Sequence, residues 1–334
     1  MEARDSHEAN RETAPPLIER GSQEMRLTPL VSIITPAYNR AGFLRETIDS
    51  VLSQDYPRIE HIVLDDGSTD ETPEVLLEYE GQITIVRHPN MGEARTVNRG
   101  IEISHGEIIV VVNSDDPLLP GAVSTAVAFL AEHPGILVAY PDWEEIDHGS
   151  NAVRHVAVPE HDYARMVRDH KCYIGPGAFI RRRGFDSAGV RNPKYQYTGD
   201  FEFWVRLGLY GPFARMPEAL ATWRTHPGSV SSTAQGKAMA REHVAMMKEY
   251  FSRSDVPGEI RALRRQAMAS AHFKAARSSG TSRLTLLWQL VCSAALDPKA
   301  ALTKRFRHTL LLLLRLLPGP VAAGIRAVWH FIHR

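Results

Sequence analysis

The 334-residue sequence contains few cysteines and neither of the common glycine-rich phosphate loops. Its two cysteines, Cys172 and Cys292, are far apart and lack the short spacing of a metal-binding pair. No G-x-G-x-x-G follows the first apolar run, and no G-x-x-x-x-G-K-[ST] occurs. These absences argue against a disulfide framework, a cysteine-based metal site, a dinucleotide-binding loop and a P-loop.

Long apolar segments are also absent. No uninterrupted apolar run reaches the length that a membrane-spanning helix needs. Residues 1–28 are polar and charged and have no apolar core of the signal-peptide type. We therefore expect a disordered leader over residues 1–28 and a cytoplasmic protein, which also fits the low cysteine content.

The charge is balanced overall but unevenly distributed. Residues 251–334 contain 14 Lys and Arg against 3 Asp and Glu, although the net charge of the whole chain is zero. "KRFRHTLLLLLRLL" and "VAAGIRAVWHFIHR" each place apolar residues on one helical face and basic residues on the other. We expect a helical region over 241–334, with 303–334 lying on an anionic membrane surface such as the inner face of the plasma membrane. The alternative is that these faces pack on the rest of the protein or on a second subunit.

Short apolar runs alternate with helical patterns from residue 29 onward. A helix over 41–54 is expected to bury one face, made of Phe43, Leu44, Ile48, Val51 and Leu52. The alternation predicts an α/β fold with a mostly parallel sheet and helices on both faces. The expected strands are "VSIIT" (31–35), "EHIVLD" (60–65), "ITIVRH" (83–88), "EIIVVV" (107–112) and "ILVAYPD" (136–142).

Polar clusters follow the first four expected strands: "TPAYN", "DDGSTD", "HPNMG" and "NSDD". One such cluster is typical of a turn, but four at the same edge of a parallel sheet indicate a ligand site. Asp115 and Asp116 are adjacent like charges, and "NSDD" itself contains no basic residue. A divalent cation, Mg²⁺ or Mn²⁺, held by carboxylates and substrate phosphates would supply the missing positive charge. The alternative is that these aspartates only cap a turn at Asp–Pro.

Six motifs together resemble glycosyltransferase family 2. They are "VSIITPAYN", "VLDDGSTD", "NMGEARTVNRG", "VVNSDD", "TGDFEFWVRL" and "WRTHPGSVS", in this order. The resemblance implies the Rossmann-like GT-A fold over residues 29–240. Within that domain, 29–142 would bind a nucleotide-sugar, and 143–240 would hold the acceptor and the catalytic base.

The resemblance also implies residue roles. Asp200 matches the catalytic base, and Asp115, Asp116 and His226 match positions at the metal. Tyr38 would lie against the nucleotide base, and Asp65 would accept a hydrogen bond from that base. The implied nucleotide-sugar contacts are Thr35, Pro36, Ala37, Tyr38, Asn39, Asp65, Asp66, Asn90, Gly92, Arg95, Asn98, Asn113, Ser114 and Arg224.

The sequence departs from the family pattern at three positions. Asn113 replaces the first aspartate of D-x-D, which leaves one fewer carboxylate for the metal or ribose. Val97 stands where the family commonly has arginine, and Arg95, one helical turn before Asn98, could substitute for it. Gly199 precedes Asp200 where many members have glutamate, which leaves the base in place.

Each assigned residue also has a structural explanation. Asp200 could be the N-cap of the helix that follows, and His226 an ordinary loop histidine. Arg224 could be a solvated charge instead of a diphosphate contact. The basic run 181–183 could attract a phosphate-bearing acceptor, although an exposed charge run is the commoner explanation.

The resemblance implies an inverting, metal-assisted transferase that moves a sugar from a nucleoside-diphosphate sugar to a hydroxyl of a glycan or lipid-linked acceptor. A nucleotidyltransferase of related fold is a rival, but its glycine-rich loop is missing here. A non-catalytic sugar-nucleotide or glycan-binding module is a second rival, and it would not need a base at position 200. No nucleic-acid partner is expected, because residues 1–250 are acidic overall.

Overall fold

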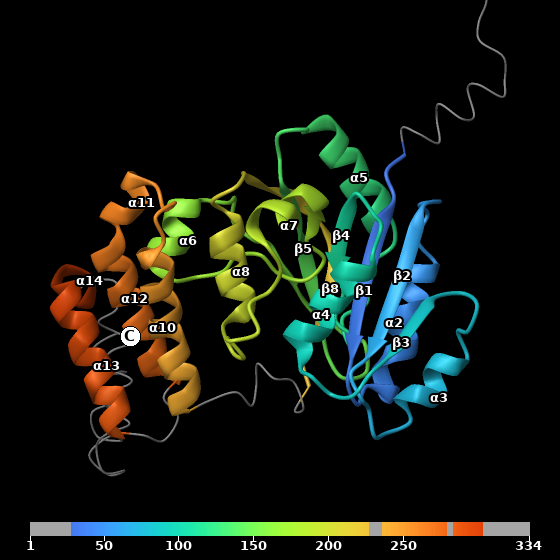
Figure 1. Cartoon of the computed structure of the whole chain (residues 1–334), viewed down its shortest axis with the longest axis horizontal. Helices are drawn as coiled ribbons and strands as arrows, with labels where there is room; N and C mark the ends of the chain where they lie inside the picture. Colours follow the sequence, from blue (N-terminus) through green and yellow to red (C-terminus); the bar gives the residue numbers. More distant parts are fainter. Residues whose placement is uncertain (1–27, 227–235, 279–282, 303–334) are drawn as a thin grey trace, which may run out of the picture.

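The computed structural model describes residues 28–226, 236–278 and 283–302, and its centre is an eight-stranded mixed sheet. The strand order is β3-β2-β1-β4-β7-β5-β6, with β8 paired to β5 (Figure 1). The strands are β1 (Val31–Ala37), β2 (Ile59–Asp65), β3 (Thr84–Arg87), β4 (Ile108–Val111), β5 (Val138–Ile146), β6 (Ala152–Val156), β7 (Phe179–Arg181) and β8 (Phe213–Arg224).

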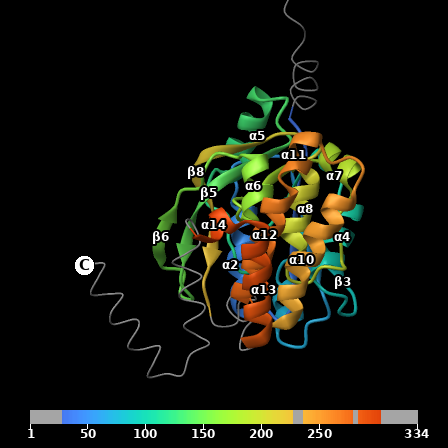
Figure 2. The same cartoon turned by 90° about the vertical axis from the view of Figure 1, so that its left-hand side faces the viewer.

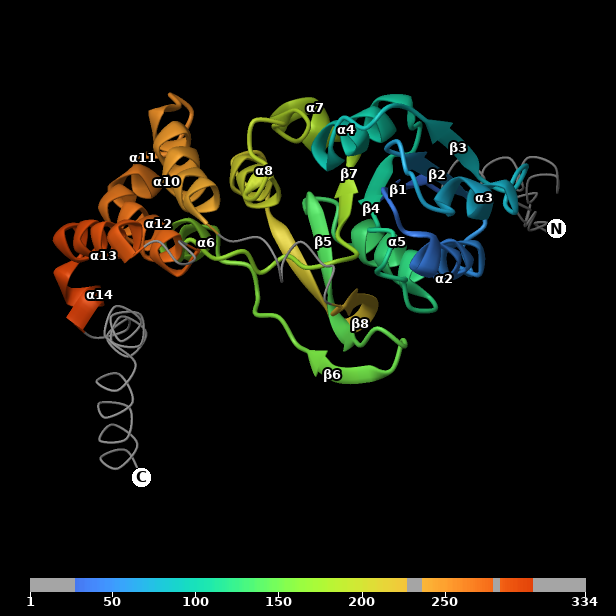
Figure 3. The same cartoon turned by 90° about the horizontal axis from the view of Figure 1, so that it is seen from below.

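The first four strands form a parallel half-sheet, as the sequence predicts. Val31 of β1 aligns with Ile59 of β2 on one side and with Ile108 of β4 on the other. Every residue of β1 is buried, because helices cover both faces. Figure 3 shows α2 (Ala41–Leu52) and α5 (Ala122–Glu132) on one face, and α4 (Glu93–Ile103) on the other. This enclosure explains why the central strand β4 is a continuous apolar run without polar alternation.

The second half of the sheet is not parallel throughout. β7 lies antiparallel between β4 and β5, and β6 pairs antiparallel with β5. β8 runs parallel to β5 and ends at Arg224, so its carboxyl end reaches the same edge as β4. The long β8 therefore carries the motif around His226 back to the acidic loop after β4.

One local expectation was wrong and another holds only in part. Leu52, expected on the buried face of α2, is 41% exposed, and Thr47 is buried there instead. In the basic run 181–183, Arg183 is exposed and Arg181 and Arg182 are half-buried, and all three donate to main-chain carbonyl oxygens. Arg181 bonds to the carbonyls of Leu130 and Ile136, and so fastens the end of α5 to β7.

The remaining helices lie beside and beyond the second half of the sheet. α3 (Thr72–Leu77) follows β2, whereas α6 (Tyr163–Asp169), α7 (Arg182–Ala188) and α8 (Gly199–Leu207) belong to the second half. The C-terminal region is helical, as expected, and begins at residue 237. It comprises α10 (Lys237–Ser252), α11 (Gly258–Ala262), α12 (Arg264–Ser278), α13 (Arg283–Leu296) and α14 (Pro298–Leu302).

These C-terminal helices pack on the catalytic half. α10 contacts α8, and α12 contacts α6, so the two layers lie side by side in Figures 1 and 2. In the part of the chain that the structure describes, no helix has both the length and the apolar character to cross a bilayer. The basic segments expected to bind a membrane, 303–334, lie outside the described residues, as does the leader 1–27.

Candidate active site

The polar segments after β1, β2 and β4 meet at one edge of the sheet. Ala37 and Asp65, the last residues of β1 and β2, are aligned in register, and the Asp66 amide donates to the Ala37 carbonyl at 2.8 Å. β4 ends two residues before Asn113, in the middle of the sheet. The prediction that these clusters share an edge follows from the parallel order of the strands.

Only part of the predicted "TPAYN" contact set is accessible. Thr35, Pro36 and Ala37 are buried in β1, and the Thr35 hydroxyl lies 3.0 Å from His61 Nε2. Burial lowers the pKa of His61 to about 3, so this histidine is neutral. Tyr38 is 46% exposed, and Asn39 turns the chain with a positive φ of 52° while its side chain accepts the Thr69 amide. Tyr38 and Asn39 are therefore the members of this group that can reach a ligand.

The two aspartates after β2 fix the loops around them. Asp65 accepts the Ser68 amide at 2.9 Å and Arg87 Nε at 3.0 Å. Asp66 accepts the amides of Met91 at 2.7 Å and Gly92 at 3.0 Å. Gly92 has φ 88°, which favours glycine, and it directly precedes α4. Asp66 thus positions the start of α4, and exposed Asn90 lies in the loop that it holds.

The acidic loop after β4 places its two adjacent carboxylates, Asp115 and Asp116, in different surroundings. Asp116 is buried and accepts the Arg224 amide at 2.8 Å and Asn113 Nδ2 at 2.9 Å. Burial, followed by the charge of Asp115, raises the pKa of Asp116 to about 7. Ser114, between them, is also buried. Asp116 therefore joins this loop to the end of β8, and it is not placed as the metal ligand expected from sequence.

Asp115 faces the other way, toward cationic and aromatic groups. Its Oδ2 lies 3.0 Å from His226 Nε2 and 3.6 Å from Arg40 Nε. The ring of Phe43, on α2, packs 4.9 Å from the His226 ring between centroids. Arg40 and Phe43 are site residues that the sequence reasoning missed. "NSDD" itself contains no basic residue, and Arg40, from the loop after β1, places a positive charge beside Asp115 in addition to the cation expected from sequence.

Arg224 is a support residue in this structure and not a solvated or ligand-facing charge. It is 1% exposed, and its Nε donates to the Asp115 carbonyl at 2.9 Å. Its other nitrogens reach Glu46 Oε2 at 2.6 Å and Ser150 Oγ at 2.9 Å. The buried guanidinium thus fixes the main chain of the acidic loop. The sequence had instead predicted that Arg224 contacts the diphosphate.

The chemistry of Asp115 and His226 fits a divalent cation that also binds substrate phosphates. A carboxylate and an imidazole nitrogen converge, and the Asn113 side chain is exposed beside them. No group of three or more His, Cys, Asp or Glu converges as a metal site within residues 28–226, 236–278 and 283–302. Mg²⁺ and Mn²⁺ accept such sparse protein ligation when phosphate oxygens and water complete the shell.

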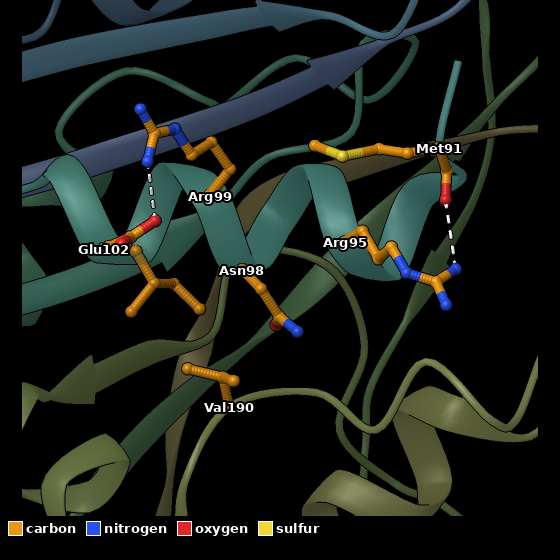
Figure 4. Close-up of a pocket in the computed structure, with 7 residues that line it drawn as sticks. Met91, Arg95, Asn98, Arg99, Glu102 and Val190 are labelled. Carbon is orange, nitrogen blue, oxygen red and sulfur yellow. Dashed lines mark hydrogen bonds and ion pairs between the residues drawn. The ribbon is translucent and has the colours of Figure 1, made fainter. Parts of the chain in front are cut away.

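Arg95 and Asn98 lie along the outer side of α4. Figure 4 shows Arg95 turned back to the Met91 carbonyl, and Asn98 pointing toward the segment that contains Val190. A hollow of about 530 Å³ runs there, and Asp115 and His226 are not among its lining residues. Asn98 exchanges two hydrogen bonds with the main chain of Arg191, at 2.8 and 2.9 Å. Asn98 therefore ties α4 to the segment that leads to Asp200.

Asp200 lies in the first turn of α8 and is open to solvent. The N-cap of α8 is Thr198, so Asp200 is not the cap, and its Oδ1 accepts the Phe201 amide at 2.6 Å. The protein packed around it raises the pKa of Asp200, and the charge of Arg191 partly opposes this. Arg191 is held in turn by Glu93 at 2.8 Å.

The segment before Asp200 is clamped by a residue from the C-terminal helices. Glu242, on α10, accepts the main-chain amides of Gln196 at 3.1 Å, Tyr197 at 2.7 Å and Thr198 at 3.2 Å. One carboxylate thus accepts from the amides of two residues just before α8 and from that of the N-cap, Thr198. Nothing in the sequence pattern pointed to Glu242, because the contact joins segments far apart in the chain.

Comparisons with known proteins agree with this arrangement. The sequence model of Glycosyl transferase family 2 matches residues 32–189. An uncharacterized glycosyltransferase of Rickettsia prowazekii is 30% identical over 216 residues, which cover 62% of this chain and 67% of that protein. The Escherichia coli protein WfaP, a UDP-Glc:α-D-GlcNAc-diphosphoundecaprenol β-1,3-glucosyltransferase, is 31% identical over 209 residues, covering 61% and 80%. The chain belongs to glycosyltransferase family 2.

Solved structures show the same fold at lower identity. S. aureus TarS, residues 1–349 in complex with UDP-GlcNAc, superposes with a TM-score of 0.63 at 21% identity, covering 89% of this chain and 87% of that one. The mannosyltransferase PcManGT of Pyrobaculum calidifontis, in complex with GDP-Man and Mn²⁺, gives 0.57 at 17%, covering 94% and 87%. This glycosyltransferase therefore has the GT-A fold with a helical C-terminal region.

A first prediction for this glycosyltransferase concerns Glu242. Glu242→Ala leaves three amides at the start of α8 without their acceptor, and Glu242→Gln keeps the shape but loses the charge. We expect kcat for donor hydrolysis to fall by about tenfold or more in the alanine variant and by less in the glutamine variant, because the segment that carries Asp200, the base expected from sequence, loses its fixed position. The donor KM should change less than about twofold, since Glu242 is not at the donor end.

The control for this test is Glu259→Gln, an exposed glutamate on α11. It should match the wild type in kcat and KM. A wild-type kcat in Glu242→Ala would show that the clamp does not position Asp200.

Proposed function

We propose that the protein is an inverting, metal-assisted glycosyltransferase that moves a sugar from a nucleoside-diphosphate sugar to an acceptor hydroxyl. The observation that carries the proposal is the pairing of two separate centres. Asp115 and His226 converge at the strand ends, and solvent-open Asp200 lies at the start of α8. The first centre suits a diphosphate and its cation, and the second suits proton removal from an acceptor.

At the donor end, Tyr38 would contact the nucleotide base, and Asn39, Asn90 and Asn113 would border the ribose and diphosphate. Asp65, expected from sequence to contact the base, is fully buried and bonded to Ser68 and Arg87, so it would support this loop instead. Asp115 and His226 would hold the divalent cation, Mn²⁺ or Mg²⁺. A bound cation supplies positive charge that stabilises the departing diphosphate.

We assign supporting roles to Asp116 and Arg224, since both are buried and fully bonded. Arg40 is placed to exchange its contact with Asp115 for one with a donor phosphate, because arginine pairs well with phosphate oxygens.

At the acceptor end, Asp200 would take the proton from the attacking hydroxyl. A general base works best when its pKa lies near the working pH, and the protein packed around Asp200 moves its pKa in that direction. The hydroxyl oxygen would attack the anomeric carbon from the face opposite the diphosphate, forming one C–O bond as the other breaks. A single displacement of this kind inverts the anomeric configuration and needs no protein nucleophile.

The choice of substrates rests on the related proteins. The TarS and PcManGT structures hold UDP-GlcNAc and GDP-Man, and the name of WfaP gives a lipid-linked acceptor. We propose a nucleoside-diphosphate sugar as donor and a glycan or lipid-linked acceptor for this chain. Attachment of 303–334 to an anionic membrane would bring the acceptor half close to a lipid-linked substrate.

The base assignment is tested by Asp200→Asn. Asparagine keeps the side-chain oxygen that accepts the Phe201 amide but cannot take a proton from the acceptor. Turnover should fall by roughly 10²- to 10⁴-fold, or about 3–5 kcal/mol in barrier. The melting temperature and the affinity for the nucleoside diphosphate with Mn²⁺ should stay at the wild-type values.

Glu202→Gln is the matched control, since Glu202 is the nearest other carboxylate on α8. Its oxygens are bonded to Arg206 at 2.7 and 2.9 Å, so it is not free to act as a base. A normal rate in Asp200→Asn, or an equal loss in both variants, would contradict the assignment of Asp200.

The raised pKa of Asp200 also predicts the pH dependence of kcat. The base works only when ionised, so kcat should fall as the pH drops through the pKa of Asp200. Because the protein packed around Asp200 raises that pKa, the fall should begin above the ordinary aspartate value of about 3.9. A pH–rate profile on the purified enzyme checks this, and a kcat that stays constant down to about pH 4 would contradict it.

A further inference from the structure

Three basic residues lie on segments that pack near the start of α8, and none of them belongs to the sheet. They are Lys171, which follows α6, and Lys274 and Arg277 on α12. Lys274 is close enough to feel the charges of the other two and of Asp200. All three residues are exposed, and within the described ranges none of them makes an ion pair with a carboxylate.

Hydrogen bonds fix the face of α12 that carries Lys274. Ser270 and Ser278 stand four positions before and after Lys274, so the three share one helical face. Ser270 Oγ donates to the Arg168 carbonyl at 2.6 Å, and Ser278 Oγ lies 3.3 Å from His243 Nε2. This face is therefore docked on the end of α6 and on α10.

A buried histidine pair links α10 to the start of α8, where Asp200 lies. His170 Nε2 lies 3.0 Å from His243 Nδ1, and the His170 ring packs edge-on against Phe201 at 4.6 Å between centroids. Phe201 directly follows Asp200 in α8. The α12 face, residues 170–172 and the start of α8 thus meet at one place, which agrees with the side-by-side helices of Figure 2.

The local charge at this place is positive. The protein packed around Lys274 first, and then the charges of Arg277 and Lys171, lower its pKa, whereas Asp200 acts in the opposite direction. Lys171 Nζ has the face of the Tyr173 ring at 5.0 Å as its described neighbour, which is no counter-charge. Like charges gathered in this way cost free energy, and a bound anion would offset that cost.

We infer that Lys171, Lys274 and Arg277 bind a phosphate group carried by the acceptor, so that an acceptor hydroxyl is presented to Asp200. The ligand class is a phosphate ester, either lipid-linked or water-soluble. The inference rests on the proposed function, in which Asp200 marks the acceptor side. The arginines of the run 181–183, the earlier candidates for this role, are committed to main-chain carbonyls.

The test is isothermal titration calorimetry on the full chain with two probes, farnesyl phosphate and glycerol 3-phosphate. A chelator prevents the probes from binding through a cation at the donor centre. A constant ionic strength keeps charge screening the same in every titration. The variants are Lys274→Gln/Arg277→Gln and Lys171→Gln. The control is Arg265→Gln, an exposed arginine of α12 about 13 Å along the helix from Lys274.

We expect the wild type and Arg265→Gln to bind at least one probe, and the double variant to bind it at least tenfold more weakly. Binding of farnesyl phosphate alone would identify a lipid-linked phosphate, whereas binding of both probes would show that the phosphate itself is recognised. The inference is overturned if neither probe binds the wild type, or if the double variant binds as the wild type does.

A parallel measurement separates this inference from the proposed function. The melting-temperature shift caused by UDP or GDP with Mn²⁺ should be the same in all variants, because a ligand that binds the folded state stabilises it. Loss of phosphate binding with an intact nucleotide shift supports the anion site. A wild type that shows no nucleotide shift would count against the proposed function itself, whatever the probes do.

Discussion

The buried carboxylate of Asp116 is the constraint on which the donor centre depends. It joins the loop after β4 to the end of β8 by accepting the Arg224 amide and the Asn113 side chain. With Asp116 turned inward, its neighbour Asp115 is turned toward His226 and Arg40. The buried Arg224 guanidinium supports the same loop through the Asp115 carbonyl. Two adjacent aspartates therefore take opposite positions, one buried in the loop and one turned toward His226 and Arg40.

The acceptor centre depends in the same way on residues outside the sheet. Glu242 clamps the chain before Asp200, and Lys274 comes from the helix packed behind it. Both residues follow position 236, so the helices from α10 onward complete the catalytic half. A boundary at residue 240 between a catalytic domain and a tail would separate Asp200 from the carboxylate that holds its segment.

The parallel half-sheet and its ligand edge could be predicted from sequence, because buried parallel strands have a continuous apolar signature and their carboxyl ends must coincide. The antiparallel insertion of β7 could not be predicted, since its three residues resemble any short apolar run. The motifs located Asp115, His226 and Asp200. The resemblance named Asp115 as the metal ligand with Asp116 as its neighbour, but it could not show that Asp116 is buried and bonded to the end of β8.

Residues that act through contacts between distant parts of the chain could not be identified from the sequence either. Arg40 lies 75 positions before Asp115, and Glu242 lies 42 positions after Asp200, so no local period connects them. Asn98 was found by the resemblance, but in this structure its amide serves the main chain of Arg191. A motif thus located this residue without revealing its contacts.

The central claim, that Asp115 holds the cation while Asp116 holds the loop, is tested most directly by Mn²⁺ binding. Free Mn²⁺ can be measured by electron paramagnetic resonance in the presence of UDP or GDP, with Asp115→Asn and Asp116→Asn compared side by side. We predict that Asp115→Asn weakens Mn²⁺ binding by about tenfold or more at an unchanged melting temperature, because it removes a charged ligand. Asp116→Asn should bind Mn²⁺ within about threefold of the wild type, since the loop contacts of outer residues affect the metal only indirectly. Equal Mn²⁺ affinity in Asp115→Asn and the wild type, with loss of binding in Asp116→Asn, would contradict the account.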